Sequence, residues 1–269
     1  MSDRLGVRLA SGWRGSLQVL STLATLAIVL GVVACPSAEP TYVARDPVLR
    51  ALPLYLYPSY GRPKAVVVFF GNDVGFWDAH DRLARRFASS GYTVIGVDVK
   101  KYIERLPEAY ASREAAFGPS IDGVIARAVR EMNAGSLPLV LGGHSFGADL
   151  AVWTAAHAPP PRTVGVLALG PTARSHFYVT AMDRANIKEP DEPGSFAIAD
   201  EIRAIPASMR IALLRGSGDH RIGIDSALQV AGGPRLRYTV IPFASHSLKS
   251  LTLAGPMAER AVAWILGPD

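Results

Sequence analysis

A serine between closely spaced glycines is the first feature of the chain that suggests chemistry. The segment GHSFG at 143–147 fits the pattern G-x-S-x-G, which holds a nucleophilic serine on a sharp turn between a strand and a helix. An apolar run precedes the motif at 137–143, and a helical pattern follows it over 146–157. Such a turn strains the backbone of the serine, and side chains at its glycine positions would collide with neighbouring elements. This context favours Ser145 as a nucleophile over a serine that only caps a helix.

A nucleophilic serine requires a general base and an acid that orients the base. His246 is the best placed histidine, because it follows the last strand pattern and precedes the final helix. Asp219 directly follows the penultimate strand pattern, where a chain with the order serine, acid, histidine carries its acid. Asp225 is the reserve candidate for the acid, and Asp98 is a weaker one.

An acyl-transfer site also needs N–H groups that stabilise the oxyanion of the intermediate. The N–H of Phe146, at the start of the helix, is the first predicted donor. The second is the N–H of Asn72, with that of Asp73 next, in the loop at 71–75 after the first strong strand pattern. The alternative for this loop is a glycine-permitted turn without a catalytic role. No cofactor is implied, and no metal, because the histidines are scattered and no Cys/His pair has ligand spacing.

The elements that would position these residues alternate along the chain. Apolar runs typical of strands lie at 52–57, 65–70, 92–98, 137–143, 163–170, 209–216 and 236–243. Helical patterns separate most of them, and the last helix is predicted to start near Pro256. Strands without polar alternation indicate a mostly parallel sheet with helices on both faces, so the predicted fold class is α/β. The irregular segment 171–209 is a candidate cap over the site.

The composition narrows the class of protein. The 269 residues are 49% hydrophobic, which suits one sizeable folded domain, predicted over 51–269. Lysine and arginine number 28 against 23 aspartate and glutamate residues, and no block of basic residues occurs. This mild positive charge argues against nucleic acid as a partner.

The first 34 residues have the features of an export signal. Basic residues precede an uncharged apolar stretch at 17–34, and the only cysteine of the chain, Cys35, follows it directly. VVAC at 32–35 resembles the bacterial lipobox, in which the cysteine is lipidated. A plain cleaved signal and an uncleaved anchor are the alternatives. We therefore expect an exported, periplasmic domain held at a membrane, with residues 35–50 as a tether and no internal disulfide.

Several segments together resemble the VirJ/AcvB family of bacterial virulence proteins, a branch of the α/β-hydrolases. GHSFGAD at 143–149 is close to the family's GYSFGAD, and GYTVIGVDVKKYIERLPE at 91–108 is similar to its strand, aspartate and tyrosine block. LALGPTARSHFYVT at 167–180 is similar to its LGLAPTADFEIHV stretch. The resemblance implies an α/β-hydrolase fold and periplasmic hydrolysis of the aminoacyl ester of lysyl-phosphatidylglycerol. It implies Ser145 as the nucleophile and His246 as the general base.

The carboxylates of segment 171–209 could receive a cationic lysyl group, and a solvated charged face is the alternative reading of each; they are Asp183, Glu189, Asp191, Glu192, Asp200 and Glu201. Asp149 is another candidate partner of the ammonium, although it also fits a residue that complements the dipole of its helix. Asp73 is a possible substrate-binding residue. Two other functions stay open. One is a general carboxylesterase or lipase that acts on lipid or small-molecule esters. The other is a non-catalytic periplasmic accessory protein that binds envelope or secretion proteins, although the retained order of serine, acid and histidine favours an enzyme.

Overall fold

The computed structural model describes residues 42–180, 190–191, 193–247 and 251–267, all within a compact unit that spans Ser37–Asp269. The predicted export signal, the lipidation of Cys35 and the start of the tether lie outside the described residues. Among the helices that are described, none is both long and apolar enough to cross a membrane.

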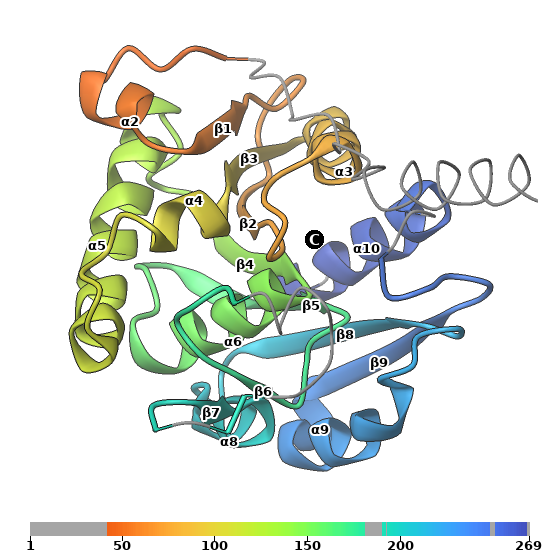
Figure 1. Ribbon diagram of the computed structural model, residues 1–269. Coiled ribbons are helices and arrows are strands. Elements are labelled where there is room, and N and C mark those ends of the chain that lie inside the picture. The colour runs from red at the N-terminus through yellow and green to blue at the C-terminus, as the bar shows by residue number, and fades with distance from the viewer. Residues whose placement is uncertain (1–41, 181–189, 192, 248–250, 268–269) are drawn as a thin grey trace, which may run out of the picture. The chain divides into compact units, whose positions relative to one another are not determined.

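A seven-stranded sheet forms the centre of the domain (Figure 1). Its strands in sequence order are β1 (Leu54–Tyr57), β2 (Ala65–Phe70), β3 (Tyr92–Val97), β4 (Leu139–His144), β5 (Thr163–Leu169), β8 (Arg210–Gly216) and β9 (Leu236–Ile241). Their order across the sheet is β1-β3-β2-β4-β5-β8-β9. Only β1 runs antiparallel to its neighbour. The prediction of an α/β fold with a mostly parallel sheet is confirmed.

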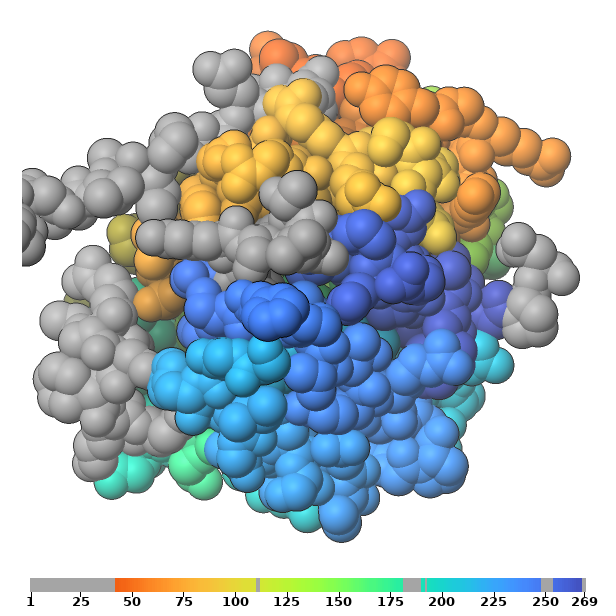
Figure 2. Space-filling view, turned by 90° about the vertical axis from the view of Figure 1, so that its right-hand side faces the viewer, coloured from red at the N-terminus to blue at the C-terminus, as the bar shows by residue number. Residues whose placement is uncertain are grey.

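Helices cover both faces of this sheet. They are α2 (Pro47–Ala51), α3 (Asp78–Ser89), α4 (Val99–Ile103), α5 (Tyr110–Glu131), α6 (Phe146–His157), α8 (Ile198–Ala204), α9 (Asp225–Gly232) and α10 (Leu251–Leu266). Short 3₁₀ turns occupy Ile222–Ile224 and Gly233–Arg235. In Figure 1 α3 and α10 lie on one side of the sheet and α5 and α6 on the other. Figure 2 shows the blue C-terminal segment directly beside the segment of α3.

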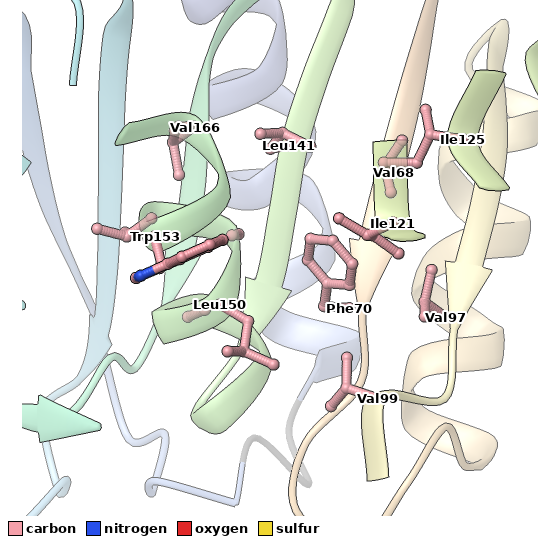
Figure 3. Close-up of a cluster of buried hydrophobic side chains, with 14 of the residues drawn as sticks. Val68, Phe70, Val97, Val99, Ile121, Ile125, Leu141, Leu150, Trp153 and Val166 are labelled. Atoms are coloured by element: carbon pink, nitrogen blue, oxygen red, sulfur yellow. The ribbon is translucent and has the colours of Figure 1, made fainter. Parts of the chain in front are cut away.

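The unbroken apolar runs of the strands explain the two covered faces. Successive side chains of a strand point to opposite faces, so an all-apolar strand has two sides to bury. Val68 and Phe70 of β2 face the cluster formed with α5 and α6, which Figure 3 shows around Ile121 and Trp153. Phe69, between them, joins the cluster formed with α3 and α10. Both faces of the sheet are therefore buried beneath helices.

Two boundaries differ from those expected. The final helix spans Leu251–Leu266, so Pro256 lies inside it rather than at its start. Within the predicted tether, residues 42–50 pack against α5. The hydroxyl of Tyr42 donates to Glu131 at 2.8 Å, Arg127 donates to Asp46 at 3.0 Å, and Leu49 is 2% exposed.

Candidate active site

The turn between β4 and α6 has the strained geometry expected of the serine motif. Ser145 has φ 53° and ψ −122°, a conformation that residues with a side chain rarely adopt. A Cβ on Gly143 would lie 2.1 Å from the carbonyl oxygen of Gly147, and a Cβ on Gly147 would lie 1.8 Å from that of Gly71. The Ser145 N–H donates to the Leu169 carbonyl at 2.8 Å, which ties the turn to β5. Only glycine fits at the two flanking positions.

The structure brings the predicted serine, histidine and acid together at the carboxyl ends of β4, β8 and β9. The Oγ of Ser145 lies 2.9 Å from Nε2 of His246. The other ring nitrogen of His246, Nδ1, lies 2.9 Å from Oδ2 of Asp219. Asp219 is 2% exposed and the side chain of His246 is 23% exposed, so the acid is the end of the chain that is best shielded from water. The three side chains form a continuous relay from hydroxyl to carboxylate.

The charge of Asp219 fixes the tautomer of His246. Burial raises the pKa of Asp219, but hydrogen bonds from His246, the Arg221 N–H and Arg215 outweigh burial and hold this pKa well below its usual range. An ionised carboxylate can only accept, so Nδ1 of His246 carries the proton and donates it to Asp219. Nε2 is then left to accept the hydroxyl proton of Ser145, as a general base requires.

Sequence reasoning missed Arg215, which stands in the otherwise apolar strand β8. Its side chain is fully buried. It donates to Asp219 at 2.9 Å, to Asp225 at 2.7 Å and to the carbonyl of Pro171 at 2.8 Å. The reserve acid Asp225 is thus the partner of Arg215 and lies outside the relay. Asp98, the weaker candidate, caps α4 instead. An arginine within an apolar run, with carboxylates four and ten residues later, is the sequence pattern that could have indicated this buried ion pair.

The two predicted oxyanion donors differ in their surroundings. Phe146 is the first residue of α6, so its N–H has no acceptor within the helix. The N–H of Asn72 already donates to the carbonyl of Gly75 at 3.2 Å, contrary to the expectation of a ready donor. The physical reason is a tight turn, in which Gly75 has φ 117° and returns its own N–H to the Asn72 carbonyl at 2.9 Å.

A pocket of about 210 Å³ opens over Ser145. Its lining comes from the 72–74 loop, the start of α6, the carboxyl end of β4 and the loops after β8 and β9. The rest belongs to the segment predicted as a cap, through Thr172, Arg174, Ser175, His176, Tyr178 and Pro190. That segment carries the antiparallel pair β6 (Arg174–Ser175) and β7 (Phe196–Ala197). A larger cavity of about 710 Å³, between α5 and α6, includes none of the predicted site residues.

Asp73 and Asp149, the possible substrate-binding residues, both line this pocket. The carboxylate of Asp149 is fully buried and accepts from the N–H of Thr172 at 2.9 Å and from its hydroxyl at 2.7 Å. It therefore fastens the candidate cap to α6, a role that its position in the sequence did not indicate. In the described part of the chain, no three His, Cys, Asp or Glu side chains gather as a metal site would need.

The family follows from the sequence match. A model of the bacterial virulence protein VirJ matches residues 64–229, which is more than half of the chain. The chain belongs to the VirJ family of bacterial virulence proteins. The resemblance seen in the sequence is thereby confirmed. The matched part of this VirJ-family chain contains Ser145 and Asp219, while His246 follows it. Among curated proteins no sequence matches the chain.

Solved structures of esterases resemble the VirJ-family domain in fold. The esterase domain of a Rhodothermus marinus protein is 16% identical, with a TM-score of 0.54 over 79% of this chain and 90% of that one. A carboxyl esterase from Bacillus coagulans is 14% identical, with a TM-score of 0.53 over 79% and 94%. Esterase 2 of Thermogutta terrifontis, phosphoramylated by tabun, is 16% identical, with a TM-score of 0.56 over 80% and 91%. The predicted α/β-hydrolase fold is confirmed.

Proposed function

We propose that this VirJ-family chain is a serine hydrolase that cleaves a carboxylic ester. The observation that carries the proposal is the unbroken relay from Ser145 through His246 to Asp219, with both heavy-atom distances at 2.9 Å. Nucleophile, base and orienting acid are already within hydrogen-bond reach, as this chemistry requires. The strained turn and the esterase-like fold are consistent with it.

The reaction proceeds in two halves. Ser145 Oγ attacks the ester carbonyl while Nε2 of His246 takes the hydroxyl proton, and Asp219 stabilises the imidazolium that results. His246 then returns the proton to the leaving alcohol, and an acyl-serine remains. Water, activated by the same histidine, attacks this acyl group and releases Ser145 and the acid.

The oxyanion of each half-reaction needs two donors. The Phe146 N–H is one of them, because it opens α6 beside the nucleophile. For the second we propose the Asn72 N–H, which turns from the Gly75 carbonyl to the substrate oxygen. The bond that it gives up is 3.2 Å long, at the weak end of the N–H···O range, so the exchange costs little.

Labelling with a fluorophosphonate tests the hydrolase. The purified full-length chain is expected to react covalently, and Ser145→Ala and His246→Ala to lose the labelling. Ser247→Ala is the matched control, because Ser247 lines the same pocket but contacts Ser245 rather than the relay. An unlabelled, folded wild-type protein would contradict the proposal and favour a non-catalytic binding protein.

The substrate that we propose is the aminoacyl ester of lysyl-phosphatidylglycerol. The resemblance to the VirJ/AcvB family supports it. The charges of the pocket suit both ends of such a molecule: the carboxylate of Asp73 suits the lysyl ammonium, and the guanidinium groups of Arg174 and Arg221 suit the headgroup phosphate.

Competing substrates test this specificity. The enzyme is expected to hydrolyse lysyl-phosphatidylglycerol with a higher kcat/KM than p-nitrophenyl butyrate, and Asp73→Asn is expected to raise KM for the lysyl lipid only. Asp78→Asn is the control, because this exposed carboxylate pairs with Arg82 on the surface of α3. Equal use of both substrates by wild type and by Asp73→Asn would indicate a general carboxylesterase.

We further propose that the domain is exported to the periplasm and held at a membrane through lipidated Cys35. The proposal rests on the basic residues and the apolar stretch that precede VVAC at 32–35. Cells grown with a clickable palmitate analogue are expected to label the wild-type chain and not Cys35→Ser. Equal labelling of both chains, or of neither, would refute the lipid anchor.

A further inference from the structure

Two buried histidines link the helix α3 to the loop that carries His246. Nε2 of His80, in the first turn of α3, lies 3.1 Å from Nδ1 of His144. Nε2 of His144, the residue before the nucleophile, lies 2.9 Å from the backbone carbonyl of His246. The rings of His80 and His144 are at most 1% exposed. The ester hydrolysis proposed above uses neither ring.

The direction of this chain of hydrogen bonds is fixed at both ends. The backbone N–H of Trp77 donates to Nδ1 of His80 at 3.3 Å, so Nε2 of His80 carries the ring proton and donates to His144. At the other end a carbonyl can only accept, so Nε2 of His144 carries its proton as well. Both rings are therefore neutral and of the same tautomer. Burial and the adjacent His144 hold the pKa of His80 well below its usual range, and burial lowers that of His144 to about 4.

The loop after β9 has few other attachments near the base. Phe243, in this loop, has φ 60° and is 93% exposed. The N–H of Phe243 donates to Ser217 at 2.9 Å, and the carbonyl of Ala244 accepts from Gly218 at the same distance. Among the described residues, His144 is the one that forms a hydrogen bond with the backbone of His246 itself. It acts on the residue whose ring must reach both Ser145 and Asp219.

We propose that His144 and His80 are positioning residues for the general base, which hold the backbone of His246 so that its ring spans nucleophile and acid. This inference rests on the proposed hydrolase. In it, His144, the residue between the first glycine and the serine of the motif, acts through the base. It connects the nucleophile turn, the first turn of α3 and the base loop into one rigid unit, since a base displaced by about 1 Å can lower a rate about 100-fold.

Four variants of the full-length chain test the inference with p-nitrophenyl butyrate. His144→Leu and His80→Leu remove a link and are expected to lower kcat about 10- to 100-fold with KM within about twofold of wild type. His144→Gln keeps an N–H at similar reach and is expected to retain most of the kcat. His157→Gln, at the far end of α6, is the control for loss of a histidine. Circular dichroism establishes that each variant is folded.

NMR of the histidine rings and the loop gives a readout that does not depend on activity. At pH 7 we expect His80 and His144 protonated at Nε2 and unprotonated at Nδ1, and greater motion of the 244–247 amides in His144→Leu than in His144→Gln. A wild-type kcat in folded His144→Leu, or a proton on Nδ1 of either ring, would overturn the inference. A wild type that hydrolyses no ester refutes the hydrolase instead, and the tautomers and loop motion still decide the positioning chain.

Discussion

Replacement of Arg215 by leucine tests the largest buried electrostatic contact near the active site. The side chain is fully buried and binds Asp219, Asp225 and the Pro171 carbonyl. Without it two carboxylates that are at most 2% exposed lose their cation. Removal of one partner from a buried ionic group costs about 3–5 kcal/mol, a large part of the roughly 5–15 kcal/mol that stabilises a typical domain.

Equilibrium unfolding in urea measures this loss at pH 7, followed by far-UV circular dichroism. We expect Arg215→Leu to lower the free energy of unfolding by about 3 kcal/mol or more. The double variant Arg215→Leu/Asp225→Leu removes one of the orphaned carboxylates and is expected to recover about 1 kcal/mol or more of that loss.

The surface pair of Arg203 and Asp200 supplies the control, since both side chains are more than half exposed. Arg203→Leu is expected to change the free energy of unfolding by no more than about 1 kcal/mol. A loss below about 1 kcal/mol for Arg215→Leu, or a double variant less stable than the single one, would refute the reasoning, because the carboxylates would then not need the arginine.

Two further predictions concern the glycines and the buried histidines. Gly147→Ala is expected to give no folded protein, because its Cβ would lie 1.8 Å from the Gly71 carbonyl oxygen. Gly123→Ala in α5 is expected to keep or raise the Tm, because its Cβ meets nothing within 4 Å. Thermal unfolding of both variants measures the difference. Burial lowers the pKa of His144 from its ordinary value of 6.5 to about 4. Between pH 6.5 and pH 4 this histidine is therefore protonated in the unfolded chain but not in the folded one. The free energy of unfolding is fully present above pH 6.5 and should fall by on the order of 3 kcal/mol towards pH 4. Urea unfolding at both pH values measures this loss, and a folded His144→Gln with an equally steep loss would contradict it.

The relay was predictable from the sequence because its signals are local. The serine motif needs only a strand before it and a helix after it, and the chain order then places an acid and a histidine after the last two strands. Asp219 and His246 were found in this way. The fold class followed from apolar runs of strand length, because a strand buried on both faces has no polar alternation.

The contacts that surround the relay depend on how the segments fold against one another, so they were harder to predict from the sequence than the relay itself. His80 and His144 are 64 residues apart, so no local pattern pairs them. The engagement of the Asn72 N–H depends on how tightly the following turn closes at Gly75. Arg215 meets Asp225 because α9, which begins at Asp225, packs against β9, the strand next to β8.

The strand order determines when the active site assembles during synthesis of the chain. From β4 onwards the sheet grows at one edge in the order of synthesis, through β5 and β8 to β9. The nucleophile therefore leaves the ribosome about a hundred residues before its base, and His246 follows the strand that is added last. A nascent or truncated chain that lacks β9 holds Ser145 without a partner. Ser145 therefore gains its general base only after β9 has been synthesised and has joined the sheet.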